Sequence, residues 1–510
     1  MDALFAPLAS SLGASVDQVK LIFCFLIAYP LGSLFIRIPA SQPNFKHIFN
    51  VLVSTFFLIP VLRVPFGVVQ LLASIFGTYF LAARIKGPNM PWIVFAHIIR
   101  AMNETTLETF EITGPQMVMT MKLTTFAWNV FDGRRPVEDL DKWQLQKRVT
   151  KYPTLLEFLG FSFYFPGILV GPYIDYASYM FLIDGSLFKT VSGEAKIPSK
   201  RAIPNGRKRV AYRKMLSGLL FLGIFVVLDP KFHYGIFRTP WFLTLNLFQR
   251  ITLFQFCGFV GRCKYYAAWI LTEGAIILTG YGFTGYNPSG ESLWEGAANV
   301  RFLNIEFPPN FKVLLDSWNI NTNVWLRECV YKRVTSKGKK PGFKSSMLTS
   351  LTSAFWHGIA PGYYLTFVFG AFVTTAARLC RVGFRPLVLP PPGAPTTIAK
   401  RVYDILGTVV TILLVNYAAM PFILLDLKDS LDGWRQFGWY GFWMVGSALV
   451  FFFAGGSQYL HRLQKQREKS AESMGRIVDE KNEMSRTPGT PLVVPPLENA
   501  AAELLLKEHN

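Results

Sequence analysis

The sequence predicts an all-α membrane protein that crosses the bilayer several times. Hydrophobic residues make up 51% of the 510 residues and charged residues only 16%, whereas soluble domains carry about a quarter charged residues. The apolar residues are gathered into long runs that recur from residue 19 to residue 459. Because about 20 apolar residues cross a bilayer as a helix, these runs predict a polytopic domain of roughly eleven transmembrane helices.

The clearest predicted spans are seven apolar runs, at 19–34, 48–62, 64–83, 215–228, 267–280, 402–425 and 442–455. The remaining predicted spans are shorter and more polar, at 114–131, 155–183, 240–260 and 346–379. Pro361 and Gly362 leave open whether 346–379 forms one helix or two. No Lys or Arg precedes the first run and no small-residue cleavage pattern follows it, so we expect a retained helix and not a signal peptide.

Membrane topology explains the distribution of the basic residues that give the chain its formal net charge of +20. The basic residues are concentrated in short loops between apolar runs, and this distribution argues against a nucleic-acid-binding surface. Nine basic residues and one acid, Glu194, lie at 189–214, and six basic residues with no acid lie at 331–344. The positive-inside rule places both loops in the cytosol.

Residues 1–460 are predicted to form the membrane domain, and 461–510 a polar cytosolic tail that is largely disordered. No internal repeat is visible, which argues against a transporter built from paired halves. The five cysteines are scattered and show neither a disulfide framework nor zinc-ligand spacing. They are Cys24, Cys257, Cys263, Cys329 and Cys380.

His357 is the polar residue that most clearly invites a chemical role. It lies in an apolar run, between Trp356 and Gly358 and shortly before Pro361, and polar residues within membrane spans are costly. A neutral imidazole there can accept a hydroxyl proton. A histidine that only packs between helices remains equally compatible with the sequence. The histidines 47, 233, 461 and 509 are expected at surfaces or interfaces, and His97 is expected to pack.

A second polar cluster precedes the basic loop at 331–344. Asn319, Asn321 and Asn323 alternate with Ile320 and Thr322 in SWNINTNVWL. A carboxamide can donate a hydrogen bond to a developing oxyanion without changing its protonation state. Helix capping or interhelical hydrogen bonding explains three closely spaced asparagines at least as well.

The pair of motifs, SWNINTNVWL followed by WHGIAPGYYLTF, resembles the membrane-bound O-acyltransferase (MBOAT) family over about residues 90–460. The family histidine falls on His357 and the family asparagine on Asn319, with Asn321 as the alternative position. Three further blocks, at 111–136, 158–179 and 287–307, resemble the lysophospholipid branch, closest to the broad-specificity fungal enzymes.

This resemblance implies an MBOAT fold around a buried catalytic chamber in the endoplasmic reticulum membrane. It implies transfer of an acyl chain from acyl-CoA to a lysophospholipid hydroxyl, with His357 as general base and Asn319 positioning a substrate or stabilising the oxyanion. Membrane lipids are the other expected partners, and no metal or further cofactor is expected. The basic loops can attract anionic headgroups or a CoA phosphate. Headgroup, acyl chain and oligomeric state are left open.

Further residues are candidates for lining the chamber. They are Trp318, Asn321, Trp356, Tyr363, Tyr364, Lys122, Asp132 and Asp175. For Lys122 and Asp132, an ion pair or a snorkelling side chain is an equally good explanation. Asp175 and Glu157 bracket a Gly- and Pro-containing stretch that is expected to bend or re-enter the membrane.

Two competing functions remain at this point. An MBOAT enzyme with a sterol, diacylglycerol or protein acceptor shares the same motifs, although the blocks at 111–136 and 158–179 favour a lysophospholipid. A polytopic transporter would use His357 as a proton relay. Nucleophile-elbow, Walker and H-E-x-x-H motifs are absent from the sequence.

Overall fold

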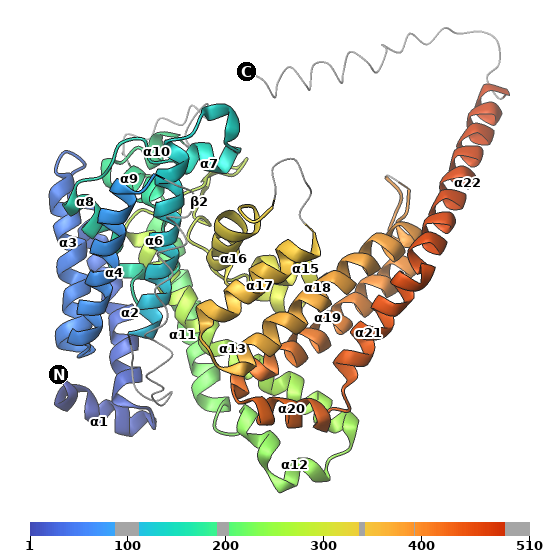
Figure 1. The fold of residues 1–510 in the computed structure, drawn as a ribbon, viewed down its shortest axis with the longest axis horizontal. Helices are drawn as coiled ribbons and strands as arrows, with labels where there is room; N and C mark the ends of the chain where they lie inside the picture. The colour runs from blue at the N-terminus through green and yellow to red at the C-terminus, as the bar shows by residue number, and fades with distance from the viewer. Residues whose placement is uncertain (87–111, 191–202, 336–341, 392, 485–510) are drawn as a thin grey trace.

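The computed structural model describes residues 1–86, 112–190, 203–335, 342–391 and 393–484. Apart from one two-stranded ribbon, the regular structure in these ranges is helical, which confirms the all-α class. Figure 1 shows the N-terminal helices, in blue and cyan, as one bundle and the C-terminal helices, in orange and red, as another. The green helices α11 and α13 lie between them.

The N-terminal bundle contains six helices and a short π-helical turn. They are α1 (Asp2–Leu12), α2 (Val16–Phe35), α3 (Pro43–Phe56), the turn η1 (Phe57–Val61), α4 (Pro65–Arg84), α6 (Thr113–Gly133) and α8 (Leu155–Ser162). Shorter elements complete this region: η3 (Val137–Asp139), α7 (Lys142–Lys147), η4 (Phe165–Gly167), α9 (Tyr176–Asp184) and α10 (Leu187–Thr190).

The central region links the two bundles. Its elements are α11 (Arg207–Leu228), η5 (Tyr234–Arg238), α12 (Pro240–Thr244), α13 (Leu247–Leu278), α14 (Phe302–Glu306), α15 (Phe311–Ser317), α16 (Ile320–Leu326) and η6 (Arg327–Tyr331). Strands β1 (Gly285–Tyr286) and β2 (Ser292–Leu293) pair antiparallel, with Gly285 opposite Leu293. The C-terminal bundle comprises α17 (Phe343–His357), α18 (Pro361–Val388), α19 (Ile398–Leu424), α20 (Leu427–Gln436), α21 (Tyr440–Phe451), η7 (Phe452–Gly456) and α22 (Ser457–Met484).

Seven helical stretches in the described ranges are long and apolar enough to cross a membrane. They are Val16–Phe35, Pro43–Val61, Pro65–Arg84, Arg207–Leu228, Pro361–Val388, Ile398–Leu424 and Tyr440–Ser470. The number eleven stays a prediction. Helices α6 and α13 are also long, but they carry more polar side chains and bury most of their residues inside the protein.

The spans predicted at 240–260 and 267–280 are wrong, because one helix, α13, runs through both from Leu247 to Leu278. The residues between the two predicted spans include Arg262, whose charge is costly in a membrane helix unless it has a partner. In the structure the Arg262 guanidinium donates to both carboxylate oxygens of Glu306, at 2.8 and 2.6 Å. Since the charge is neutralised inside the protein, the helix has no reason to end there.

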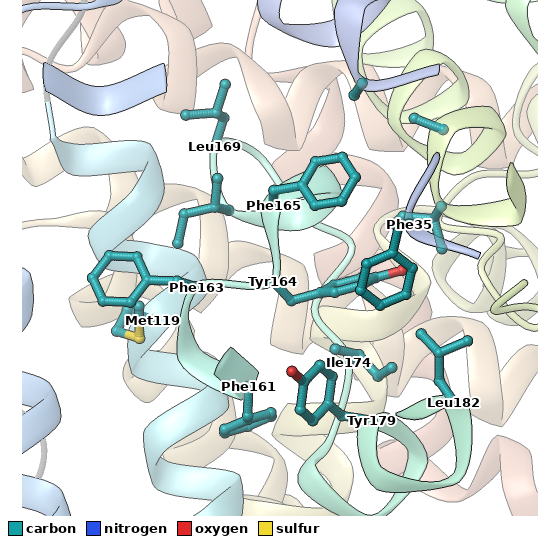
Figure 2. Packing of buried hydrophobic residues seen from close by; sticks show 14 of the residues in the cluster. Phe35, Met119, Phe161, Phe163, Tyr164, Phe165, Leu169, Ile174, Tyr179 and Leu182 are labelled. Atoms are coloured by element: carbon teal, nitrogen blue, oxygen red, sulfur yellow. The ribbon is translucent and has the colours of Figure 1, made fainter. Parts of the chain in front are cut away.

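The stretch predicted as a span at 155–183 is not one helix. It consists of α8, the turn η4 and α9, joined by irregular backbone that is buried. Figure 2 shows Phe163, Tyr164 and Phe165 among the buried hydrophobic residues of one cluster, in which the Phe165 ring contacts that of Phe35. Polar groups from other helices satisfy its backbone, as when the Ser54 hydroxyl donates to the Phe163 carbonyl oxygen at 2.6 Å. The bent segment expected here is confirmed, and internal hydrogen bonds make it compatible with a membrane interior.

The disordered tail predicted from 461 is wrong for residues 461–484, because α22 continues to Met484. Gln464 donates to the Val382 carbonyl oxygen at 2.9 Å, an acceptor that Pro386 leaves without its helical partner. Arg467 donates to the Leu389 carbonyl oxygen at 2.6 Å. The polar face of α22 therefore completes the end of α18, a contact that composition could not reveal.

Candidate active site

His357 is the last residue of α17 and lies where the chain breaks before α18. Gly358, the next residue, has φ 141° and ψ −166°, a conformation that residues with a Cβ atom avoid. Pro361 opens α18, where a missing N–H leaves no helical bond unmade. The segment predicted at 346–379 is therefore two helices, and His357 lies at their junction.

Gly362 sets the distance between the start of α18 and the end of α19. Its N–H donates to the Leu425 carbonyl oxygen at 2.8 Å. A Cβ atom at this position would lie 2.0 Å from the Pro421 carbonyl oxygen, so a larger residue requires a helix to move. The contact matters for the site because α19 also carries Phe422, a neighbour of His357.

Four aromatic rings surround the imidazole of His357. Their centroids lie at 4.6 Å (Trp356), 4.8 Å (Phe422), 5.2 Å (Phe367) and 5.6 Å (Tyr363) from its own. The Phe367 ring is nearly parallel to it, at 19°, and the Phe422 ring is edge-on, at 83°. The histidine is half-buried. Aromatic packing thus places apolar groups around the ring.

Asn319 precedes α16 in a left-handed backbone conformation. Its φ is 45° and its ψ 56°, which asparagine adopts more readily than most residues. Its Oδ1 accepts hydrogen bonds from Nδ2 of Asn299 at 3.1 Å and from Oγ1 of Thr322 at 2.9 Å. The side chain is half-buried. Hydrogen bonds, and not ring contacts, therefore orient this residue.

Helix α6 supports the His357 junction. The indole N–H of Trp356, the residue before the histidine, donates to the Met117 carbonyl oxygen at 3.1 Å. The Trp356 ring also contacts Trp325 of α16, with centroids 5.6 Å apart. The end of α17 is thereby attached both to α6 and to the helix that follows Asn319.

The same helix supports the Asn319 turn. The Thr322 hydroxyl lies 3.3 Å from Sδ of Met121. Met117 and Met121 are one helical turn apart and share a face of α6. The chain neighbour of His357 (Trp356) and a hydrogen-bond partner of Asn319 (Thr322) therefore contact the same face of α6.

The structure describes the surroundings of three further predicted chamber residues, Trp318, Tyr363 and Tyr364. Trp318 packs against α13, where its ring centroid lies 5.1 Å from that of Trp269 and 5.6 Å from that of Tyr265. Tyr363 contacts His357, as described above. Tyr364, the next residue of α18, is half-buried and is not one of the four rings around the histidine.

Asn321 and Asn323 act as hydrogen-bonding connectors in the structure. The backbone N–H and Nδ2 of Asn321 both donate to Oδ1 of Asn299, at 3.0 and 3.1 Å. Nδ2 of Asn323 donates to the Trp318 carbonyl oxygen at 2.7 Å. The structural explanation therefore fits these two asparagines, whereas Asn319 occupies the turn itself.

Lys122 of α6 is almost completely buried, with 1% of its surface exposed. Its Nζ donates to the carbonyl oxygens of Phe161 and Ser162, at 2.5 and 3.0 Å, at the end of α8. An ammonium group at a helix C-terminus compensates the unpaired carbonyls. Neither an ion pair nor snorkelling describes this lysine, which instead stabilises the irregular segment after α8.

Asp132 forms an ion pair, which is one of the two structural explanations given for it above. Its carboxylate is fully buried and accepts hydrogen bonds from both terminal nitrogens of Arg333, at 2.8 and 2.5 Å. The guanidinium also lies over the Trp128 ring, 4.2 Å from its centroid. This pair attaches the segment after α16 to the end of α6.

Asp175 caps α9 by accepting from the Ser178 N–H at 2.9 Å, and it pairs with Lys147 at 2.8 Å. Glu157 caps α8 by accepting from the Thr154 N–H at 2.7 Å. His47, expected at a surface, is buried, and its Nδ1 lies 2.8 Å from the Tyr179 hydroxyl. These residues stabilise the N-terminal bundle.

The described part of the basic loop at 331–344 is tied to the polar connection after α6. Lys332 donates to Asp141 at 2.8 Å. Partial burial opposes ionisation of Asp141, but the hydrogen bonds from Lys332 and from the Gln144 backbone hold its pKa below the usual value. His97, His509 and five of the ten lysines in the two basic loops lie outside the described residues.

A cavity of about 310 Å³ lies between α7, α8 and α9, lined among others by Arg148, Lys151 and Phe181. Neither His357 nor Asn319 lines it. The chamber around His357 therefore stays a prediction.

Three residues of the site escaped the sequence analysis: Phe367, Phe422 and Asn299. Phe367 had a signal, because it follows Tyr363 by one helical turn and shares its face. Phe422 and Asn299 come from distant segments, and nothing local connects them with His357 or Asn319.

The sequence is similar to known proteins over most of its length. The model of the membrane-bound O-acyltransferase family matches residues 98–420, a range that contains both His357 and Asn319. A lysophospholipid acyltransferase of Schizosaccharomyces pombe is 40% identical over 445 residues, which cover 86% of each chain. One of Saccharomyces cerevisiae is 35% identical, over 89% of this chain and 76% of the relative. The human membrane-bound glycerophospholipid O-acyltransferase 2 is 30% identical, over 86% and 84%.

Proposed function

Because this chain belongs to the membrane-bound O-acyltransferase family, we propose that it transfers an acyl chain from acyl-CoA to the free glycerol hydroxyl of a lysophospholipid. The observation that carries the proposal is that Trp356, the residue before His357, and Thr322, a hydrogen-bond partner of Asn319, both contact the same face of α6. The names of the fungal relatives support a lysophospholipid as the acceptor.

The proposed reaction is a direct transfer. Nε2 or Nδ1 of His357 takes the proton from the lysophospholipid hydroxyl as its oxygen attacks the thioester carbonyl carbon of acyl-CoA. The carbonyl oxygen becomes an oxyanion, and Asn319 donates a hydrogen bond to it. When the tetrahedral intermediate collapses, the carbon–sulfur bond breaks and the imidazolium returns its proton to the CoA thiolate. The products are a phospholipid and CoA, and the base is regenerated.

A membrane site suits these reactants physically. Both are amphiphiles, so their acyl chains favour the hydrocarbon interior while the CoA nucleotide stays in water. Apolar rings around His357 exclude water that would compete with the acceptor hydroxyl. The two basic loops, assigned to the cytosol, attract the CoA phosphates, and residence in the endoplasmic reticulum membrane fits cytosolic acyl-CoA.

A substrate matrix tests the proposal. Purified protein in nanodiscs is given a series of acyl-CoA donors with lysophospholipids of several headgroups, and CoA release and phospholipid formation are measured together. We expect stoichiometric formation of both products with at least one lysophospholipid. Sterol, diacylglycerol and peptide acceptors in the same matrix should give no ester.

Two results would contradict the proposal. Ester formation with only a sterol, diacylglycerol or peptide would retain the family and replace the acceptor. Substrate flux across sealed liposomes without consumption of acyl-CoA would indicate a transporter.

A further inference from the structure

Asn299 is a buried residue that links the Asn319 turn to a distant segment. It has 2% of its surface exposed and lies after β2, in an extended stretch before α14. This stretch runs antiparallel to the Asn319 turn, because Val300 pairs with Trp318 and the Ile320 N–H donates to the Asn299 carbonyl oxygen at 2.9 Å. The backbone contacts fix the Asn299 side chain directly beside Asn319.

The backbone identifies which end of the Asn299 amide is the oxygen. The N–H of Asn321 lies 3.0 Å from Oδ1 of Asn299. Since a backbone N–H can only donate, its partner has to be an acceptor, and the opposite end of the Asn299 amide is the NH2 group. That group lies 3.1 Å from the Asn319 side chain.

The same argument then determines the orientation of the Asn319 amide. The atom that receives the Asn299 NH2 has to be Oδ1 of Asn319, and the Thr322 hydroxyl lies 2.9 Å from this oxygen. Within the described ranges, no group accepts a hydrogen bond from Nδ2 of Asn319. The amide therefore faces the protein with its oxygen and retains its NH2 group as a hydrogen-bond donor.

We propose that Asn299 is a positioning residue, which acts by holding the Asn319 amide with Nδ2 directed to the acyl carbonyl oxygen of the substrate. This inference rests on the proposed function and on the assignment of Asn319 to that site. It restricts Asn319 to one role, that of a donor, which is the role an oxyanion requires.

The alternative orientation explains why a positioning residue is needed. The two ends of a carboxamide have nearly the same size, so packing alone does not choose between them. A flipped Asn319 would present its oxygen to the developing oxyanion, and two acceptors repel. Only a donor fixed on the protein side selects the productive orientation.

Asn299→Asp is the direct test. The new carboxylate still accepts from Asn321, but it cannot donate to Asn319 and favours the flipped amide. We expect kcat to fall about 10²-fold, as for removal of one oxyanion donor, with KM for acyl-CoA and lysophospholipid nearly unchanged. Asn304→Asp is the matched control, because Nδ2 of Asn304 contacts Ser317 at 3.3 Å, beside the same turn, without reaching Asn319.

A double variant separates positioning from a general structural role. If Asn299 acts only through Asn319, then Asn299→Asp added to Asn319→Ala should change kcat by less than about twofold, because the two effects share one interaction. Effects that multiply would overturn the proposal. So would wild-type kcat in Asn299→Asp when Asn319→Ala is impaired.

The outcomes distinguish this inference from the proposed function. Full activity of Asn319→Ala removes the assigned role of Asn319 and the inference with it, but leaves acyl transfer standing. If Asn299→Asp does not fold, Asn299→Ala takes its place, because it removes the same donor to Oδ1 of Asn319 without adding a charge. We expect Asn299→Ala to lower kcat with KM nearly unchanged, and wild-type kcat in Asn299→Ala would overturn the proposal.

Discussion

The turn at His357 and the turn at Asn319 are attached to the same face of α6, yet they hold their side chains by different forces. Aromatic rings from α17, α18 and α19 surround the imidazole of His357. Hydrogen bonds from Asn299 and Thr322 hold the amide of Asn319. Ring contacts help to orient the first residue, and hydrogen-bond donors orient the second.

The difference fits the chemical role proposed for each side chain. A general base changes its protonation state during the reaction, and packing against flat rings orients an imidazole without depending on which nitrogen carries the proton. An amide donor has to present one particular end, and only hydrogen bonds distinguish its nitrogen from its oxygen. The chemistry of each residue is therefore matched by the kind of support around it.

The largest effect is expected on the packed side, from His357→Ala. Loss of a general base should lower kcat by as much as about 10⁴-fold, and loss of the ring contacts should also lower the unfolding temperature. Steady-state acyl transfer and a thermal melt of the purified protein measure both. His461→Ala, at an exposed position of α22, is the matched control. Wild-type turnover of His357→Ala would remove the assigned base.

The hydrogen-bonded side should give the next largest effect. Asn319→Ala removes one donor and should lower kcat by about 10² to 10³-fold. Asn321→Ala removes contacts to Asn299 but not the Asn319 amide, so we expect a loss below about tenfold. If Asn321→Ala abolishes transfer in a folded protein while Asn319→Ala does not, the family asparagine has been assigned to the wrong position.

Gly362→Ala tests whether the aromatic enclosure depends on helix spacing. The added Cβ atom displaces α18 from α19, which should lower the free energy of unfolding by about 1–3 kcal/mol and reduce kcat, because Phe422 moves with α19. Gly370→Ala, on the same helix, meets no atom within 4 Å and should stabilise by up to about 1 kcal/mol. Equal unfolding temperatures for the two variants would contradict this account.

The smallest effect is expected from one ring of the enclosure. Phe422→Leu retains bulk but removes the edge-on contact with His357, which is worth about 0.5–1.5 kcal/mol and predicts a loss in kcat of tenfold or less. Phe442→Leu, in the aromatic packing around Trp434, should leave kcat unchanged. A loss in Phe422→Leu as large as that in His357→Ala would show that the ring does more than orient the base.

Much of the fold and of the candidate site could be predicted from the sequence, because the signals lie in short contiguous segments. Apolar runs indicated the membrane domain, and WHGIAPGYYLTF and SWNINTNVWL indicated His357 and Asn319. The break at Pro361 was also visible, because proline and glycine act on their own backbone. The continuity of α13 could not be predicted from the sequence, because the helix passes Arg262 only where Glu306, 44 residues further along the chain, neutralises its charge.

The sequence by itself determined the class of the protein, its family and the residue types available for chemistry. Tertiary structure alone decided what each polar residue does. Lys122 and Asp132 looked equivalent as polar residues in an apolar setting, yet one caps α8 and the other binds Arg333. The orientation of the Asn319 amide likewise depends on Asn299. The physical reason is that a buried polar group is defined by its partner, and those partners come from other segments of the chain.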